Sequence, residues 1–386
     1  MAEPIRVLHV LDDAQPGGGM THLLQLARWF DPARVRVAFA VPPDGPLLPA
    51  LHREHVPVHP IPFRSRLDPL AILRLARICR GRFELLHSHN ARANVHARFA
   101  ARLAAVPVTV STVHNSVFKY DVSVARQRLY AAAERRTVRW ANRIVAVSSG
   151  IAEDLVLRYG IPSAKIVVIP NGIDPECLRP SRPATAIRAE FGVAPSSALI
   201  VQVGRLTPQK GFDTLLLALV RIRAAFPSVR TLLVGDGPDR PALESLASRL
   251  EIDDCVQFLG YRTDVIDILT AAELVTVPSR SEGMPYTLLE AMGLGRPVVA
   301  SRIPGITEVV QDGHTGILIP PNDPAALASA ALRVLRNPQS AATFGAHAKT
   351  HTLTYFTAER MARSLTDLYT ILLSEAIKHE TDSTSF

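Results

Sequence analysis

Short apolar runs rich in β-branched residues alternate with longer amphipathic stretches along most of the 386-residue chain. This alternation is typical of a parallel sheet whose strands are connected by crossover helices on both faces. The alternation restarts at Ala198, so it predicts two doubly wound α/β units. The expected strands are Ile5–Val10, Arg36–Val41, Leu85–His89, Val108–His114, Arg143–Ser148 and Lys165–Pro170, then Ala198–Gly204, Thr231–Gly235, Val256–Leu259, Leu274–Pro278, Pro297–Ala300 and Gly316–Ile319.

The two units are expected to meet near residue 180. Leu178–Pro183 carries two prolines, which cannot continue a helix or a central strand, and this favours a hinge. The predicted domains are therefore 1–180 and 181–355, each of ordinary size for one core. After Pro324 the chain is expected to be helical to about Lys378, with a polar, frayed end.

Composition excludes several classes of protein. A hydrophobic content of 47% with 20% charged residues excludes a disordered or fibrous chain. No apolar run approaches the length of a membrane span, and Val7–Leu11 is too short for a signal peptide, so we expect a cytoplasmic protein. The three cysteines are far apart and are expected to be inert thiols.

The net charge of +8 is unevenly distributed. Residues 1–180 hold 24 Lys and Arg against 14 Asp and Glu, a net of +10, whereas residues 181–386 hold 19 against 21, a net of −2. An anionic partner of the first half would therefore be attracted by a field that the second half lacks.

Glycine-rich turns follow several expected strands, at the sheet edge where such folds bind ligands. Gly204–Gly211 contains Arg205 and Lys210 and precedes an expected helix, an arrangement that suits a diphosphate. Ser279–Met292 follows another strand and opens a helix, with Glu282 ahead of the helix and Glu290 inside it. Two carboxylates at this spacing could contact different parts of one nucleotide sugar.

The order of these motifs resembles glycosyltransferase family 4, whose members are retaining enzymes of the GT-B fold. The resemblance covers nearly the whole chain. It is carried by Pro16–Gly18, Pro170–Asp174, Gly204-Arg205 with Lys210-Gly211, Gly235–Pro238, Phe258–Gly260, Glu282–Glu290 and Gly313–Ile319.

The resemblance implies two facing Rossmann-like domains with a cleft between them, and a last helix, from about Phe356, that crosses back to the N-terminal domain. It implies that Arg205 and Lys210 bind the donor diphosphate, Glu290 the ribose and Glu282 the transferred sugar. The other expected donor contacts are Gly18, Gly19 and Gly204, the loop Gly283-Met284-Pro285, and Tyr261-Arg262 beside the base.

Histidines of the first half raise a separate question. His114 ends an expected strand and matches a family histidine that faces the donor sugar, although a lone strand-end histidine is more often a packed or hydrogen-bonded residue. His87 and His89 could present two imidazoles on one strand face to a metal, but the sequence identifies no third ligand, so we expect no metal site.

The resulting prediction is a metal-independent glycosyltransferase, a hexosyltransferase that uses a nucleotide diphosphate sugar and no cofactor. It would act in polysaccharide, lipopolysaccharide or glycolipid synthesis. One alternative is a GT-B sugar-nucleotide epimerase or a phosphorylase with pyridoxal phosphate; epimerisation without acceptor, or pyridoxal absorbance, would identify these. Another is a non-catalytic binding protein, which donor turnover would exclude.

The last expectation concerns partners. We expect an acceptor that could be lipid-linked, and no nucleic acid. Val124–Arg143 is a basic stretch that could lie on an anionic membrane at the inner face of the cell; a solvated helix face is the alternative. Its six arginines are Arg126, Arg128, Arg135, Arg136, Arg139 and Arg143, and its apolar residues are Leu129, Tyr130, Val138 and Trp140.

Overall fold

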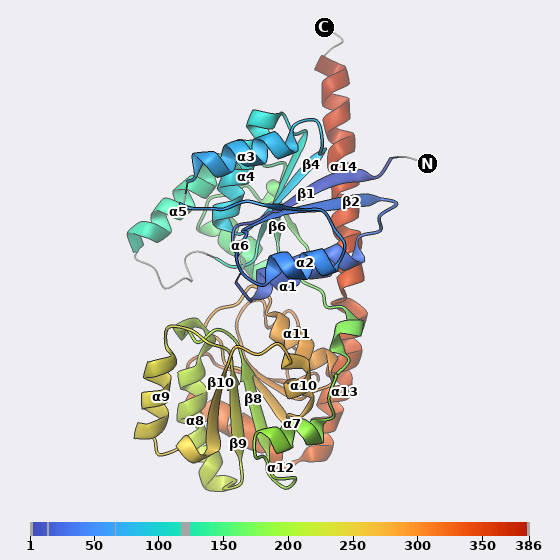
Figure 1. The fold of residues 1–386 in the computed structure, drawn as a ribbon. Helices are drawn as coiled ribbons and strands as arrows, with labels where there is room; N and C mark the ends of the chain where they lie inside the picture. The colour runs from blue at the N-terminus through green and yellow to red at the C-terminus, as the bar shows by residue number, and fades with distance from the viewer. Residues whose placement is uncertain (1–2, 14, 66, 117–123, 384–386) are drawn as a thin grey trace. The chain divides into compact units, whose positions relative to one another are not determined.

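The computed structural model describes residues 3–13, 15–65, 67–116 and 124–383, and the chain forms two compact units. Met1–Gly172 and Ala358–Phe386 make up the first unit, and Ile173–Thr357 makes up the second (Figure 1). The chain enters and leaves the second unit at neighbouring points, because Ile173 N–H donates to Phe356 C=O over 2.9 Å.

The first unit is a seven-stranded parallel sheet with helices on both faces. In spatial order its strands are β3 (Val58–Pro60), β2 (Val35–Val41), β1 (Ile5–Leu11), β4 (Leu85–His89), β5 (Val108–Val113), β6 (Arg143–Ala146) and β7 (Ile166–Val168). Its helices are α1 (Gly18–Trp29), α2 (Leu47–Arg53), α3 (Pro69–Cys79), α4 (Ala91–Ala104), α5 (Val124–Thr137), α6 (Ser149–Leu157) and α14 (Ala358–Ser383), with 3₁₀ turns at Val138–Trp140 and Ser163–Lys165.

The two faces of this sheet pack against different helices. Alternate residues of β1 point in opposite directions, so Leu8 packs against α3 and α4 while Val7 packs against α1 and α14. Through Tyr369 and its neighbours, α14 completes the second of these cores. The last helix therefore belongs to the first unit, as the family resemblance implied.

One ion pair is fully buried in the first unit. Arg98 of α4 contacts Glu134 of α5 over 2.6 Å, and neither side chain is more than 3% exposed. Arg98 also donates to the Ser111 and Thr137 hydroxyls. These bonds compensate for removing the guanidinium from water.

The second unit is a six-stranded parallel sheet. In spatial order its strands are β10 (Val256–Gly260), β9 (Arg230–Val234), β8 (Leu199–Val203), β11 (Leu274–Val277), β12 (Val298–Ser301) and β13 (Ile317–Ile319). Its helices are α7 (Ala184–Glu190), α8 (Phe212–Ala225), α9 (Arg240–Arg249), α10 (Val265–Thr270), α11 (Tyr286–Gly293), α12 (Pro324–Arg336) and α13 (Pro338–Tyr355), with 3₁₀ turns at Pro175–Leu178, Pro208–Lys210 and Asp253–Cys255.

The structure divides the chain earlier than residue 180. The proline-containing segment expected as a hinge lies inside the second unit, where Leu178 is buried. Ser181 donates to the Asp267 carboxylate from its backbone N–H, over 2.6 Å, and from its hydroxyl, over 2.7 Å. Because Asp267 is buried and needs donors, it fixes this segment.

Two further details differ from the sequence prediction. The edge strand β3 was not predicted, and it is only three residues long. The terminal helix α14 continues to Ser383, beyond the expected end near Lys378, so most of the residues expected to fray are helical. Among the described residues, no helix is long and apolar enough to cross a membrane.

Candidate functional site

Three loops of the second unit meet at the carboxyl ends of β8, β9 and β11. A Cβ on Gly235, whose φ is +130°, would lie 1.9 Å from the Gly204 carbonyl oxygen. A Cβ on Gly211, whose φ is +65°, would lie 2.1 Å from the Pro278 carbonyl oxygen. Only glycine allows these backbones to approach so closely, and the contacts fix the loops that carry the expected donor residues.

Lys210 and Glu282, which are 72 positions apart, come together in this region. Lys210 Nζ lies 2.6 Å from Glu282 Oε1, and Ser279 Oγ donates to the same oxygen over 2.8 Å. Glu282 is only 5% exposed. Together with Thr287, these residues contribute the polar side of a small pocket that Val203, Val277 and Pro285 also line. The structure therefore unites the two sequence motifs in one site.

The loop that carries Glu282 is buried and firmly held. Gln209 Nε2 donates to Ser281 C=O over 2.7 Å, and Arg280 N–H donates to Gln209 C=O over 2.8 Å. Gly283, Met284 and Pro285 are all buried. Pro285 is the N-cap residue of α11, which begins at Tyr286. The loop is thus a fixed backbone surface at the start of a helix.

Glu290 lies one turn further along α11 than Tyr286 and carries an unusual carboxyl group. Burial raises the pKa of Glu290 to about 7. Burial, together with the nearby Glu290 charge, also raises the pKa of Tyr286. Glu290 therefore changes its charge near neutral pH, where a typical glutamate is fully ionised.

The remaining residues of this unit that are expected to bind the sugar donor differ in whether their side chains are exposed or already paired within the protein. Arg205 is exposed, and its guanidinium has no hydrogen-bond or ion-pair partner among the described residues. Tyr261 is 53% exposed at the end of β10. The Arg262 guanidinium is held by Asp264 over 2.7 Å and by Glu190 over 3.0 Å. Arg205 is thus available for an anion, whereas Arg262 is paired with two carboxylates and Lys210 with one.

The glycine turn of the first unit leads directly into α1, which begins at Gly18. A Cβ on Gly19 would come no closer than 3.5 Å to the Leu11 side chain, which is an ordinary contact. Packing within this unit therefore does not require glycine at position 19. That a side chain at position 18 or 19 would obstruct the donor diphosphate remains a prediction.

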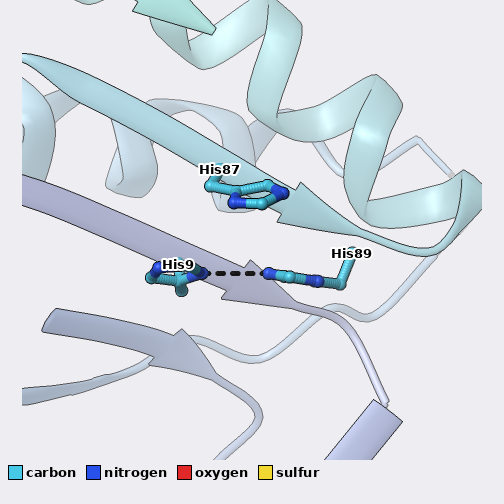
Figure 2. Close-up of side chains that lie close together, drawn as sticks. All are labelled: His9, His87 and His89. Carbon is cyan, nitrogen blue, oxygen red and sulfur yellow. Dashed lines mark hydrogen bonds between the residues drawn. The ribbon is translucent and has the colours of Figure 1, made fainter. Parts of the chain in front are cut away.

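Five histidines gather in the first unit, and we call them the histidine cluster: His9, His22, His87, His89 and His114. Figure 2 shows three of them, His9 on β1 and His87 and His89 on the neighbouring strand β4. His9 Nδ1 lies 3.0 Å from His89 Nε2, and His89 Nδ1 lies 3.3 Å from His114 Nε2. The His22 and His114 rings meet edge to face, with centroids 4.6 Å apart.

Burial holds the histidine cluster in its neutral form. It lowers the pKa of His9 to about 3 and that of His114 to about 4. For His22, His87 and His89, burial and the neighbouring imidazoles lower the pKa well below 6.5. At neutral pH the cluster offers hydrogen-bond donors and nitrogen lone pairs, and no charge.

The sequence identified no third ligand beside His87 and His89, whereas the structure brings further histidines close to them. His9 is the register partner of His87 on β1, and His22 approaches from α1. Ligand atoms of His9, His87 and His89 lie within 4.8 Å of one another, as do those of His22, His89 and His114. The signal was a polar residue, His9, among the apolar residues Val7–Leu11 of the central strand β1.

Comparisons with known proteins identify both halves of the chain. Residues 16–177 match the model of Glycosyltransferase Family 4, and residues 197–337 match that of Glycosyl transferases group 1. The D-inositol 3-phosphate glycosyltransferase of Kribbella flavida is 31% identical, with 89% of each chain covered.

Solved structures share the fold. The Anabaena protein HepE in complex with UDP-glucose is 25% identical with a TM-score of 0.85, covering 95% of this chain and 99% of HepE. Sucrose-phosphate synthase from Thermosynechococcus elongatus has a TM-score of 0.80 at 24% identity, with 97% of this chain and 100% of the synthase covered. With its two parallel sheets and both family models matched in order, the chain belongs to glycosyltransferase family 4 and has the GT-B fold.

Proposed function

We propose that this glycosyltransferase moves a hexose from a nucleoside diphosphate sugar to an acceptor hydroxyl, with retention of configuration and without a metal at the diphosphate. The observation that carries the proposal is the pocket where Lys210, Glu282 and Ser279 meet, together with the exposed Arg205 of the loop that carries Lys210. Retention is inferred from the family, and we name no enzymic nucleophile.

The leaving nucleoside diphosphate gains negative charge as the glycosidic bond breaks. Arg205 and Lys210 are the cations we assign to this charge, because both lie in the loop after β8. Glu282 fixes Lys210, and such fixed charges stabilise a transition state without reorganisation. In other enzymes a divalent metal ion supplies the positive charge that stabilises the diphosphate. Here we assign that task to Arg205 and Lys210.

The two carboxylates are assigned to different parts of the donor. Glu282 uses Oε1 for Lys210 and Ser279, so Oε2 is the oxygen we assign to hydroxyls of the transferred sugar. Glu290 is assigned to the ribose hydroxyls, to which it can bind as a carboxylate acceptor. His114 is assigned to the donor sugar, as a neutral hydrogen-bonding group.

We further propose an acceptor that carries phosphate or is linked to a lipid. The relative from Kribbella flavida is named for D-inositol 3-phosphate, and the first half of this chain carries a net charge of +10. Anionic acceptors would be attracted to such a field. The products would be a polysaccharide, lipopolysaccharide or glycolipid.

Peripheral contact with an anionic membrane is the associated proposal. Arg128, Arg135, Arg136 and Arg139 are exposed, and Leu129 beside them is 61% exposed. Val138 is buried and Arg143 contacts Glu375, so these two residues are not assigned to the membrane. The side chain of Arg126 lies outside the described residues.

The first experiment is a thermal-shift panel of nucleotides and nucleotide sugars, followed by turnover with phosphorylated and lipid-linked acceptors. Uridine diphosphate sugars come first, because HepE binds UDP-glucose. A true donor at 100 times its dissociation constant should stabilise the protein by about 2.7 kcal/mol. Donor consumption that needs no acceptor and yields an epimer would favour the epimerase instead.

A second experiment addresses the metal. Turnover should be unchanged in excess EDTA, because protein cations are assigned to the diphosphate. Loss of turnover in EDTA that Mg²⁺ or Mn²⁺ restores would contradict the metal-free mechanism.

A further inference from the structure

Three imidazoles of the histidine cluster come from three different elements and converge at the carboxyl edge of the first sheet. His22 belongs to α1, His89 ends β4 and His114 directly follows β5. The atoms through which they can bind a ligand lie within 4.8 Å of one another. Three nitrogen donors at this separation match the number that open tetrahedral zinc sites use.

The distance between His89 and His114 is compatible with a shared ligand as well as with a direct hydrogen bond. His89 Nδ1 and His114 Nε2 are 3.3 Å apart, at the long end for a hydrogen bond donated by N–H. Two nitrogens that bind one tetrahedral Zn²⁺ at 2.0–2.1 Å are separated by about 3.3 Å. The pair therefore already has the spacing of two ligands, and the ligand atom of His22 lies within 4.8 Å of both.

Two of these rings are oriented by contacts on their far sides. His22 Nδ1 lies 3.2 Å from Asn171 Oδ1, and in the tautomer that donates from Nδ1 to this oxygen the lone pair is on Nε2. His89 Nε2 lies 3.0 Å from His9 Nδ1 and can donate to it, which leaves Nδ1 as the ligand atom. Metal-binding histidines are typically held by such outer partners.

The other group of three histidines is less suited to a metal. His87 Nδ1 lies 2.5 Å from Tyr369 Oη, and His87 Nε2 lies 2.7 Å from Thr112 Oγ1, so both nitrogens are engaged. His9, His87 and His89 are also fully buried. His114, by contrast, is only half-buried, which gives the group of His22, His89 and His114 a route to solvent.

We propose that His22, His89 and His114 form a binding site for a divalent transition-metal ion of the zinc class, with a fourth position for water. Imidazole nitrogen suits Zn²⁺, Co²⁺ and Ni²⁺, whereas Mg²⁺ prefers oxygen, so this site is separate from any ion at a diphosphate. Metal binding would occupy His114 and inhibit sugar transfer. That consequence rests on the proposed function, whereas the metal site itself does not.

The test measures metal binding without a donor or acceptor, so its result is independent of the transferase proposal. The full chain, free of affinity tags and stripped of metal with EDTA, is titrated with Zn²⁺ by calorimetry and with Co²⁺ by visible absorption. We expect one ion per chain and the strong visible bands of tetrahedral Co²⁺. His114→Gln and His22→Gln should each weaken Zn²⁺ binding by about 100-fold or more, and Asn171→Ala by about 10-fold.

Two controls define the site. His52→Gln removes an exposed histidine of α2 and should change the affinity less than about twofold, within the range of an ordinary surface substitution. His87→Asn should retain one ion per chain, and circular dichroism checks that each variant is folded. Absence of binding tighter than about 1 mM, or binding unaffected by both His114→Gln and His22→Gln, would overturn the proposal. So would loss of the ion in His87→Asn alone.

Discussion

The carboxyl ends of the strands carry neutral imidazoles in the first unit and charged side chains in the second. In the first unit, burial lowers the pKa values of His9 and His114 far below neutrality. In the second, Lys210 and Glu282 form an ion pair, and Arg205 of the same loop is exposed. The first sheet also has an ion pair at this edge, between Asp12 and Arg92, so the buried imidazoles are what distinguishes the two edges.

The difference follows from where the polar groups are attached. The first unit places histidines within or next to central strands, where water is excluded and only the neutral form is favourable. The second unit places its cations in a loop held by glycine contacts, where Lys210 keeps partial exposure. The charged side chains of Arg98 and Glu134, which the first unit also buries, form an ion pair.

The largest expected effect concerns that pair. Arg98→Ala leaves Glu134 buried without its cation and should destabilise the first unit by about 3–5 kcal/mol. Both tryptophans, Trp29 and Trp140, lie in this unit, so urea unfolding followed by tryptophan fluorescence reports on it selectively. Arg102→Ala, an exposed change one turn along α4, is the control and should cost under about 0.5 kcal/mol. Equal midpoints for the two variants would show that the pair is not stabilising.

The next effect tests the cations of the second unit. Arg205→Ala or Lys210→Ala should lower kcat/KM by about 100-fold or more, because each removes a group assigned to the charge of the leaving diphosphate. Steady-state kinetics with the identified donor measures this. Arg221→Ala on α8 removes an exposed arginine of the same unit and should leave kcat/KM unchanged. Activity of the first two variants within about threefold of the parent would remove the diphosphate assignment.

A smaller effect should appear as a pH dependence of donor binding. Ribose hydroxyls favour the ionised Glu290, whose pKa is about 7, so protonation below that value competes with binding. The dissociation constant of the nucleotide sugar should rise about tenfold per pH unit below 7 and be constant above it. Calorimetry from about pH 5.5 to about pH 8.5 measures this dependence.

Two substitutions check the assignment of the carboxylates. Glu290→Gln should weaken binding of every nucleotide and abolish the pH dependence. Glu282→Gln should weaken the nucleotide sugar and spare the free nucleoside diphosphate. Identical effects of both substitutions on both ligands would show that the roles are misassigned.

The smallest expected effect is membrane binding by the basic surface of the first unit. Co-sedimentation should show binding to anionic vesicles at low salt and loss of binding near about 0.5 M NaCl, since each basic residue contributes about 1 kcal/mol and is screened by salt. Arg135→Glu with Arg136→Glu should weaken it. Equal partition onto neutral and anionic vesicles would contradict the proposal.

The sequence predicted the fold well because periodic apolar runs are local signals. Of the thirteen strands that the described residues form, twelve were expected close to their observed bounds. The exception, β3, has only three residues and includes Pro60, so neither its length nor its composition signals a strand. The loop after β8 and the loop after β11 were also recognised, because glycine, proline and charged residues occur there in a fixed order.

What the sequence left open was which distant residues meet. It indicated separate roles for Lys210 and Glu282, but only the parallel pairing of β8 with β11 places Lys210 Nζ 2.6 Å from Glu282 Oε1. It suggested Arg262 as a donor residue, whereas Glu190 and Asp264 hold its guanidinium.

The chain order alone therefore determined two α/β units, their ligand-binding loops and the family, because each depends on neighbours in sequence. The tertiary structure alone decided the histidine cluster. His9, His89 and His114 are brought together by the register of β1 beside β4 and of β4 beside β5, and His22 by the packing of α1. Their neutral state is also a tertiary property, since removal of water by packing, and no neighbour in sequence, lowers the imidazole pKa.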